Sequence, residues 1–427
     1  MRFSSQLCLL ACAAVLFGAG RATADNWPQW RGVNHDGVSK ETSVPTQWSA
    51  DKNIAWTLNM PGLGSSTPAV WGDRLFLTVE DGKDTVLLCV SIDGKELWKR
   101  PVGKARGKIR GDEGDGAGAS PSTDGKHVWV FVASGEVACF EVVDGIEVWK
   151  FNAQERYGKF DIAFGLHSTP ILDGDRLFMQ FIHTAGAWVV AVDKATGKDV
   201  WKVARPSDGV AECKHSYASP TLWRNGKDAA FIVHGNDYAT GHALDDGREL
   251  WRVGGLNPKT NYNRTLRFVA SPVATPDLIV IPSAKHGPVV GLKPNAKGLI
   301  DGGSEFEQWR RPKDTPDVPS PLIYDGLVYL CGENGALICM DAKTGKEHYN
   351  QRAHPGIYRA SPVCAGGLIY LTARDGTITV VKAGPKFELV AENKLSDVFA
   401  ASPAISNGRI YLHGRDKLYA IGAKEKP

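Results

Sequence analysis

The sequence predicts an all-β fold, an eight-bladed β-propeller of four-stranded blades, and three observations support this prediction. A short stretch that ends in tryptophan recurs along the chain, and a small residue followed by proline recurs out of phase with it. No segment shows a sustained apolar period of 3.6 residues, which argues against helices. Repeats of about 48 residues are typical of propellers and solenoids. The prolines of the second marker are Pro68, Pro121, Pro170, Pro220, Pro272, Pro321, Pro362 and Pro403.

The clearest tryptophan stretch runs from Ala191 to Trp201. It reads as the end of one strand, a tight turn with Asp193, Thr196 and Gly197, and the start of the next strand. Trp201 is expected to anchor that outer strand by ring packing. Related stretches end at Trp98, Trp149 and Trp251.

The unit that begins at Pro170 shows the strands expected in each blade. Short apolar runs at 170–172, 176–181, 188–192 and 200–202 are separated by turns that contain Gly or Asp. β-Branched and aromatic residues are frequent in these runs, as in strands that pack on a half-buried sheet. Four strands joined by tight turns fit a propeller blade better than a helical repeat.

Residues 1–24 read as a secretory signal peptide. An apolar run from Leu7 to Phe17, too short to span a bilayer, precedes a cleavage site of small residues that ends at Ala24. The protein is therefore expected in the periplasm or outside the cell, without a transmembrane segment. Lipidation of Cys12, which follows Leu-Leu-Ala, is the less favoured alternative.

Residues 25–50 form a Trp-rich leader, and residues 51–427 form the predicted propeller. The leader opens with Trp27 and Trp30 and continues with Arg31. Two tryptophans in four residues are expected to be shielded from water, so the leader should pack on the propeller wall or on one of its faces. A structural plug is the favoured interpretation, and recognition by Trp30 and Arg31 is the alternative.

A strand around Trp56 lacks the three strands that precede tryptophan in the other units. The last unit, after Pro403, ends before any tryptophan strand. We therefore expect the strand around Trp56 to complete the last blade, which closes the ring and leaves no exposed edge. Seven blades is the alternative, if the weak repeat at 288–309 or the one around Phe387 is an insertion.

The composition fits a secreted β-protein and excludes some partners. The chain has 427 residues, of which 43% are hydrophobic, together with 47 Gly and 24 Pro. The formal net charge is +3, and both Arg2 and Arg21 belong to the predicted signal peptide. Nothing here suggests a basic field for nucleic acid or a polybasic membrane patch. A monomer is expected.

Three cysteines at one repeat position are expected to be free. Cys89, Cys139 and Cys339 occupy the repeat position of Ala191, in different blades. Equivalent positions in separate blades should lie beyond the 4.4–6.8 Å between Cα atoms that a disulfide needs, as a rough guide. We interpret these residues as small buried hydrophobes.

The pattern Ala191, Asp193, Thr196, Gly197 and Trp201 resembles the tryptophan-docking motif of the pyrroloquinoline-quinone (PQQ)-type propeller repeat. The resemblance extends from about Ile54 to the C-terminus, and the family includes quinoprotein dehydrogenases and the outer-membrane assembly lipoprotein BamB. It implies a propeller but leaves enzymatic activity open, since one fold hosts many functions.

The site is expected at one mouth of the central channel, where the residues just before the proline marker begin the innermost strands. They combine cations, carboxylates and aromatic rings, which predicts a polar pocket with apolar walls that binds a cofactor or a partner. The candidates are Asp115, Phe164, His167, Lys214, His215, Tyr217, Arg264, Arg267, Asp317, Tyr358, Arg359 and Phe399.

Three functions are compatible with this sequence. The favoured one is a non-enzymatic scaffold that binds another envelope or secreted protein, or a small polar ligand, at the channel mouth. The alternatives are a PQQ-dependent oxidoreductase of alcohols or sugars and a carbohydrate-binding or sensing propeller. PQQ has three carboxylates, which His167, Lys214, Arg267 and Arg359 are placed to bind.

The resemblance also implies features that this chain lacks. It has no vicinal cysteine pair of the kind that PQQ alcohol dehydrogenases place over their cofactor, and no convincing calcium set. The acidic run from Asp112 to Asp115 is interpreted as a solvated loop rather than a calcium site. No catalytic residue, metal or cofactor is therefore predicted, with PQQ and calcium as the alternative.

Overall fold

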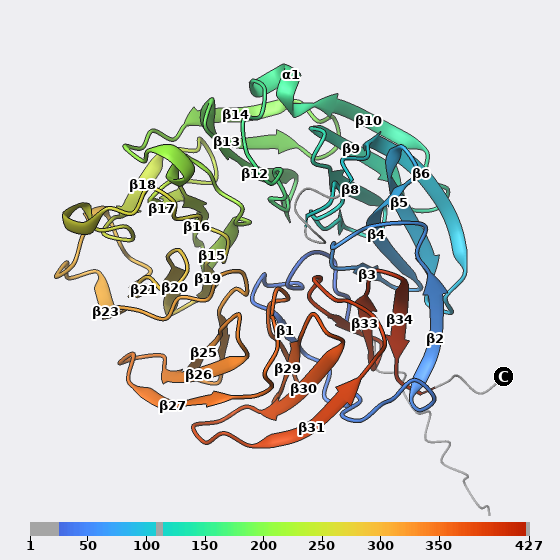
Figure 1. The fold of residues 1–427 in the computed structure, drawn as a ribbon. Helices are drawn as coiled ribbons and strands as arrows, with labels where there is room; N and C mark the ends of the chain where they lie inside the picture. Colours follow the sequence, from blue (N-terminus) through green and yellow to red (C-terminus); the bar gives the residue numbers. More distant parts are fainter. Residues whose placement is uncertain (1–24, 108–113, 424–427) are drawn as a thin grey trace, which may run out of the picture.

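The computed structural model describes residues 25–107 and 114–423, and these residues form eight blades arranged in a ring (Figure 1). Each blade is an antiparallel sheet whose first strand is innermost. The prediction of eight blades is confirmed, and the alternative of seven is wrong. In blades 1 to 4 the strands are β3 (Ala69–Trp71), β4 (Arg74–Asp81), β5 (Asp84–Ser91), β6 (Glu96–Lys104); β7 (Ser122–Thr123), β8 (His127–Phe131), β9 (Glu136–Glu141), β10 (Glu147–Asn152); β11 (Ile171–Asp173), β12 (Arg176–His183), β13 (Gly186–Asp193), β14 (Asp199–Ala204); β15 (Thr221–Asn225), β16 (Asp228–Gly235), β17 (Tyr238–His242), β18 (Glu249–Val253).

The second half of the ring repeats this order. In blades 5 to 8 the strands are β19 (Val273–Thr275), β20 (Leu278–Pro282), β21 (Val289–Leu292), β23 (Glu307–Arg311); β24 (Leu322–Tyr324), β25 (Leu327–Cys331), β26 (Ala336–Asp341), β27 (Glu347–Arg352); β28 (Val363–Ala365), β29 (Leu368–Thr372), β30 (Thr377–Lys382), β31 (Leu389–Lys394); β32 (Ala404–Ser406), β33 (Arg409–His413), β34 (Lys417–Ile421), β2 (Ile54–Asn59).

The ring is closed by β2, as the sequence predicts. This strand pairs antiparallel with β34 from the other end of the chain, with Trp56 opposite Ala420. Blade 8 thus combines three strands from the C-terminal part of the described chain with an outer strand from its N-terminal part, which covers the edge of β34.

Two short strands extend neighbouring sheets. β22 (Gly298–Ile300) lies in the long connection between β21 and β23, and it pairs parallel with β18 of the preceding blade. β1 (Val38–Ser39) belongs to the leader and pairs parallel with β28, the innermost strand of blade 7. The weak repeat at 288–309 is therefore a complete blade with an insertion that reaches its neighbour.

Helices are short in the described residues: α1 (Ala153–Tyr157) and two 3-10 turns, η1 (Ala211–Lys214) and η2 (Lys259–Asn261). In this part of the chain, no helix has the length and apolar character needed to cross a membrane.

The hydrophobic core lies between the blades. One cluster joins Phe76 and Leu87 of blade 1 to Val128 and Phe140 of blade 2. The middle strands are covered on both faces, which explains why they read as continuous apolar runs instead of alternating apolar and polar residues.

The tryptophans of the outer strands dock each blade on the next. Trp201 of blade 3 donates its indole N–H to the carbonyl of Leu244 in blade 4, at 2.9 Å. Trp98 and Trp149 make the same bond to the turn of their following blades, at 3.1 and 3.0 Å. Trp56 bonds to Ile92 at 2.7 Å and so links blade 8 to blade 1.

Gly197 explains the Thr-Gly of the motif. Its φ of 64° is a left-handed conformation that favours glycine, and a Cβ added there would lie 2.6 Å from the ring of Trp149. Asp193 holds the same turn, because its carboxylate accepts hydrogen bonds from the N–H and the hydroxyl of Thr196. The motif therefore shapes a turn against which the tryptophan of the preceding blade packs.

Trp251 is the tryptophan that the β22 insertion covers. It is only 2% exposed. A Cβ added at Gly241, opposite it on β17, would lie 2.2 Å from the indole ring. The glycine at the repeat position of Ala191 thus makes room for the ring.

Cys89, Cys139 and Cys339 are free and buried, as predicted, and the other cysteines of the described residues, Cys213, Cys331 and Cys364, are free and buried as well. Burial raises the pKa of the Cys89, Cys139, Cys331 and Cys364 thiols to about 12. A thiol with such a pKa stays protonated and unreactive at neutral pH. These residues act as small apolar side chains in the core.

Replacing Trp201 by alanine should lower the free energy of unfolding by about 3 kcal/mol, since a partly buried aromatic ring and its inter-blade hydrogen bond are lost. Urea unfolding followed by circular dichroism measures this change. The matched control is Val200→Ala on the same strand, which is 42% exposed and should cost less than about 0.5 kcal/mol. Equal effects of the two substitutions would show that Trp201 does not dock the blades.

Candidate functional site

A cavity of about 640 Å³ opens at one mouth of the channel. Its lining comes from every blade and from the leader, and it mixes cations, carboxylates, hydroxyls and aromatic rings. Of the predicted candidates, the cavity is lined by Asp115, Phe164, His167, Tyr217, Arg267, Asp317 and Arg359.

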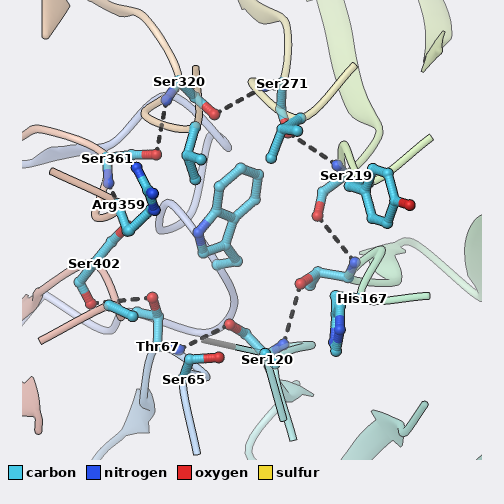
Figure 2. A pocket seen from close by; sticks show the side chains of 18 of the residues that line it. Ser65, Thr67, Ser120, His167, Ser219, Ser271, Ser320, Arg359, Ser361 and Ser402 are labelled. Atoms are coloured by element: carbon cyan, nitrogen blue, oxygen red, sulfur yellow. Dashed lines mark hydrogen bonds between the residues drawn. The ribbon is translucent and has the colours of Figure 1, made fainter. Parts of the chain in front are cut away.

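A circle of hydroxyl side chains surrounds this cavity (Figure 2). Each member directly precedes a proline of the sequence marker and lies two residues before the start of an innermost strand. The backbone N–H of each member donates to the hydroxyl oxygen of the next, at 2.9–3.1 Å. The last junction differs, since the Thr67 hydroxyl donates to the carbonyl of Ser402 at 3.0 Å. The members of this hydroxyl ring are Thr67, Ser120, Thr169, Ser219, Ser271, Ser320, Ser361 and Ser402.

The hydroxyl ring has a directional property. Its serines, together with Thr169, accept a backbone N–H, and among the described residues they donate no hydrogen bond in return. A hydroxyl has one hydrogen to donate in addition to its lone pairs. The ring therefore lines the cavity with O–H donors.

The cations of the lining are held by neighbouring side chains. The Arg267 guanidinium lies 5.0 Å from the centroid of the Phe164 ring, and its Nε is 3.8 Å from a carboxylate oxygen of Glu212. Arg359 lies 4.0 Å from Asp317, which is also 3.9 Å from Lys285. These contacts fix the guanidinium groups at the rim.

His167 is oriented by the backbone. Its Nε2 lies 2.9 Å from the carbonyl oxygen of Phe164, so Nε2 must carry the proton that makes this bond. Arg359 and His167 lie at opposite sides of the hydroxyl ring in Figure 2.

The other predicted candidates lie outside the cavity lining. Tyr358 and Phe399 are fully buried in the core, and the Phe399 ring packs 5.8 Å from that of Tyr419. His215 is buried and bonds to the Thr184 hydroxyl at 2.7 Å. Lys214 ends η1, and Arg264 is exposed on the connection after η2. None of these five residues lines the cavity.

The leader closes the channel beyond the hydroxyl ring. We expected it on the wall or a face of the propeller; instead it lies against the innermost strands, inside the ring (Figure 1). Trp27 exchanges backbone hydrogen bonds with Val70, and the Gln29 amide bonds to the backbone of Leu172. Val70 is three residues past Thr67, which corresponds to about 10 Å along a strand.

The leader is also tied to the opposite side of the ring. The buried Arg31 guanidinium donates to the carbonyls of Asp36 at 2.7 Å and of Pro321 at 2.6 Å. Burial lowers its pKa to about 10, so the side chain remains charged at neutral pH. Trp30, the residue before it, is half-buried and lines the cavity. Arg31 thus anchors the leader in the channel, and Trp30 lines the cavity.

The residues missed by sequence reasoning are the hydroxyl ring and Arg374, whereas Trp30, which the sequence offered as an alternative recognition residue, lines the cavity. A signal for the ring was present, because every marker proline follows a Ser or Thr. That hydroxyl was interpreted only as a small residue before a turn. Nothing in the local sequence indicates that Trp30 meets the channel, since its neighbours there are far along the chain.

The cavity offers anion-binding groups, but no metal cluster is found in the described residues. There, no three His, Cys, Asp or Glu side chains gather into a set that would hold a metal ion. The acidic run 112–115 lies partly outside the described residues, since the structure describes only its last members.

Comparisons with known proteins support the fold. A sequence model of the family described as outer membrane protein assembly factor BamB matches residues 40–226, 133–384 and 300–424. BamB from Moraxella catarrhalis is similar with a TM-score of 0.61 and 13% identity, over 86% of this chain and 99% of that one. No curated protein sequence is significantly similar to the chain.

Dehydrogenases share the fold as well. A europium-containing methanol dehydrogenase has a TM-score of 0.69 at 12% identity, over 92% of this chain and 90% of its own. A quinohemoprotein alcohol dehydrogenase from Comamonas testosteroni has a TM-score of 0.66 at 13% sequence identity, over 94% of this chain and 81% of its own. At such identities the similarity concerns the fold alone, and it does not distinguish binding from catalysis.

Replacing Ser271 by alanine should lower the free energy of unfolding by about 1–2 kcal/mol, because the buried N–H of Ser219 loses its acceptor. Ser271→Thr keeps the hydroxyl, as Thr67 and Thr169 do elsewhere in the ring, and should cost less. Urea unfolding measures both, with the exposed Ser396→Ala as control. If Ser271→Ala and Ser396→Ala cost the same, the ring does not couple the blades.

His35 in the leader should make stability depend on pH. Burial, together with Arg224 and Arg31, lowers its pKa from 6.5 to about 4. Between these values the unfolded chain binds the proton and the folded chain does not, so stability is lost as pH falls from about 6.5 to about 4. His35→Gln should reduce the slope of unfolding free energy against pH by up to about 1 kcal/mol per pH unit.

The control for this slope is His348→Gln, at an exposed position. Urea unfolding between pH 4.5 and 6.5 gives the slope for each variant. Identical slopes for the wild type and both variants would show that His35 takes up its proton in the folded state.

Proposed function

The chain belongs to the PQQ-type β-propeller family described as outer membrane protein assembly factor BamB, and from this premise we propose that it is a non-enzymatic scaffold that binds another protein at its channel mouth. The family description refers to assembly at the outer membrane. An envelope or secreted location agrees with it and with the predicted signal peptide.

The observation that carries this proposal is the chemistry of the mouth cavity. Its hydroxyl donors are held in place by backbone hydrogen bonds, and its guanidinium groups are held by aromatic and acidic neighbours. Such preformed donors around an apolar floor suit the binding of a polar group. The cysteines of the described residues are buried and have raised pKa values, which makes them poor redox or nucleophilic groups.

PQQ with calcium fits this cavity only in part. Arg267, Arg359 and Arg374 line the cavity and suit the cofactor carboxylates, whereas Lys214, which the sequence suggested for that role, lies outside it. Calcium takes roughly six to eight oxygen ligands, and no cluster of three acidic, His or Cys side chains occurs in the part of the chain that the structure describes. The residues present therefore do not fit the complete cofactor site, and we derive no oxidation step.

Photo-crosslinking tests the scaffold. A benzophenone amino acid is placed at Phe164, which lines the mouth, or as control at Val143, which is 72% exposed on a turn of blade 2. In host envelope extract, the Phe164 probe should give one discrete adduct that the Val143 probe does not give. The captured protein, identified by mass and then purified, should re-form the complex with the unlabelled propeller.

Two results would overturn the proposal. One is dye-linked oxidation of an alcohol or a sugar after the purified protein is supplied with PQQ and calcium. The other is binding on a glycan array with affinity that the mouth variant Arg359→Gln abolishes, without any protein adduct at Phe164.

A further inference from the structure

The leader lies at the inner side of the mouth cavity, where Trp30 is part of the lining. A chain that enters through the hydroxyl ring meets the leader, which crosses the channel from Val70 of blade 1 to Cys364 of blade 7. The leader is fixed there by backbone pairing and by the buried Arg31, which bonds to blade 6. An extended segment therefore cannot thread straight through the channel at this level, and a chain end is the simplest occupant that the cavity accepts.

The donors of the cavity define the chemistry of that end. The hydroxyl ring presents O–H donors whose oxygens already accept a backbone N–H. Arg267 and Arg359 add positive charge at the rim. The lining contains three arginines, Arg267, Arg359 and Arg374, against two aspartates, Asp115 and Asp317, so its described side chains carry an excess of positive charge. The cavity thus favours an occupant that brings acceptors and negative charge.

The size and the floor agree with a short peptide end. A volume of about 640 Å³ lies within the usual range of ligand pockets. Trp30 provides an apolar surface at the leader, and Phe164 and Tyr217, whose ring centroids are 5.9 Å apart, provide a second one at the rim. Aromatic faces of this kind pack against side chains of a bound segment.

We propose that the cavity captures the C-terminal end of the partner polypeptide, with its free carboxylate directed into the hydroxyl ring and between Arg267 and Arg359. This inference rests on the proposed scaffold function and specifies which part of the partner binds. A terminal carboxylate accepts hydrogen bonds from several donors at once, and the backbone carbonyls of the last residues add further acceptors.

Two peptide pools test the inference. Random hexapeptides with acetylated N-termini are synthesised once with a free C-terminal carboxylate and once with a C-terminal amide. Each pool is captured on the immobilised protein, and mass spectrometry identifies the enriched sequences. The free-acid pool should be enriched, and fluorescence anisotropy should show that amidation weakens the tightest binder by about tenfold or more.

Matched variants locate the binding. Arg267→Gln and Arg359→Gln should each raise the Kd for the selected peptide by roughly five- to twentyfold. Arg264→Gln, an exposed arginine three residues from Arg267 and outside the cavity lining, should leave binding unchanged. Circular dichroism and the melting temperature verify that each variant is folded.

The outcomes separate this inference from the proposed function. Equal capture of acid and amide pools, or no capture of either while the Phe164 probe still gives its adduct, overturns the chain-end inference and leaves the scaffold standing. Displacement of the peptide by galacturonic acid at the same concentration also overturns it, in favour of a small acid. Absence of both peptide capture and adduct contradicts both proposals.

Discussion

The backbone N–H groups at the start of the innermost strands impose the constraint on which this ring depends. These groups are buried near the channel and have no partner within their own blade, and an unpaired buried N–H is costly. At seven of the eight positions the N–H donates to the hydroxyl of the following blade, as Ser219 does to Ser271 at 2.9 Å. Because the acceptor always belongs to the next blade, the bonds order the blades around the axis. The indole bonds of Trp149 and Trp201 repeat this relation at the outer edge, so neighbouring blades are joined at both radii.

A ring of this kind needs a closure that does not rely on repetition. The hydrogen-bond pattern changes between blades 8 and 1. There the Thr67 hydroxyl donates to the backbone carbonyl of Ser402, whereas at the other junctions a backbone N–H donates to a hydroxyl. The same junction is reinforced by β2, which completes blade 8, and by Trp56, which docks on blade 1. The leader then bonds to strands on several sides of the channel, including the Arg31 bond to Pro321. The junction between blades 8 and 1 is thus supported by segments that lie outside the repeat.

The sequence predicts the features of this structure that recur in every blade better than the features that occur once. Blade number and closure were predictable, since each unit carries its own Trp and Pro markers and the ends lack complementary strands. The rim was predictable only as a set of backbone positions. Whether Tyr358 turns into the core, or Arg267 into the cavity, depends on loop conformations that no repeat determines. The course of the leader was not predictable, because Arg31 meets Pro321 across 290 positions of sequence.

In a molecule built from equivalent units, function is expected where the equivalence fails. The hydroxyls occur in every blade, and their hydrogen bonds between blades give them a structural role. They form a binding surface only through the hydroxyl hydrogens that these bonds do not use. Arg267, Arg359 and Trp30 have no counterpart at the same place in the other units, and all three line one cavity. The repeated residues therefore form the framework of the cavity. The unrepeated ones supply its positive charge, from Arg267 and Arg359, and an apolar surface, from Trp30. Since Trp30 belongs to the leader, the segment that secures the fold also forms part of the surface that meets the ligand.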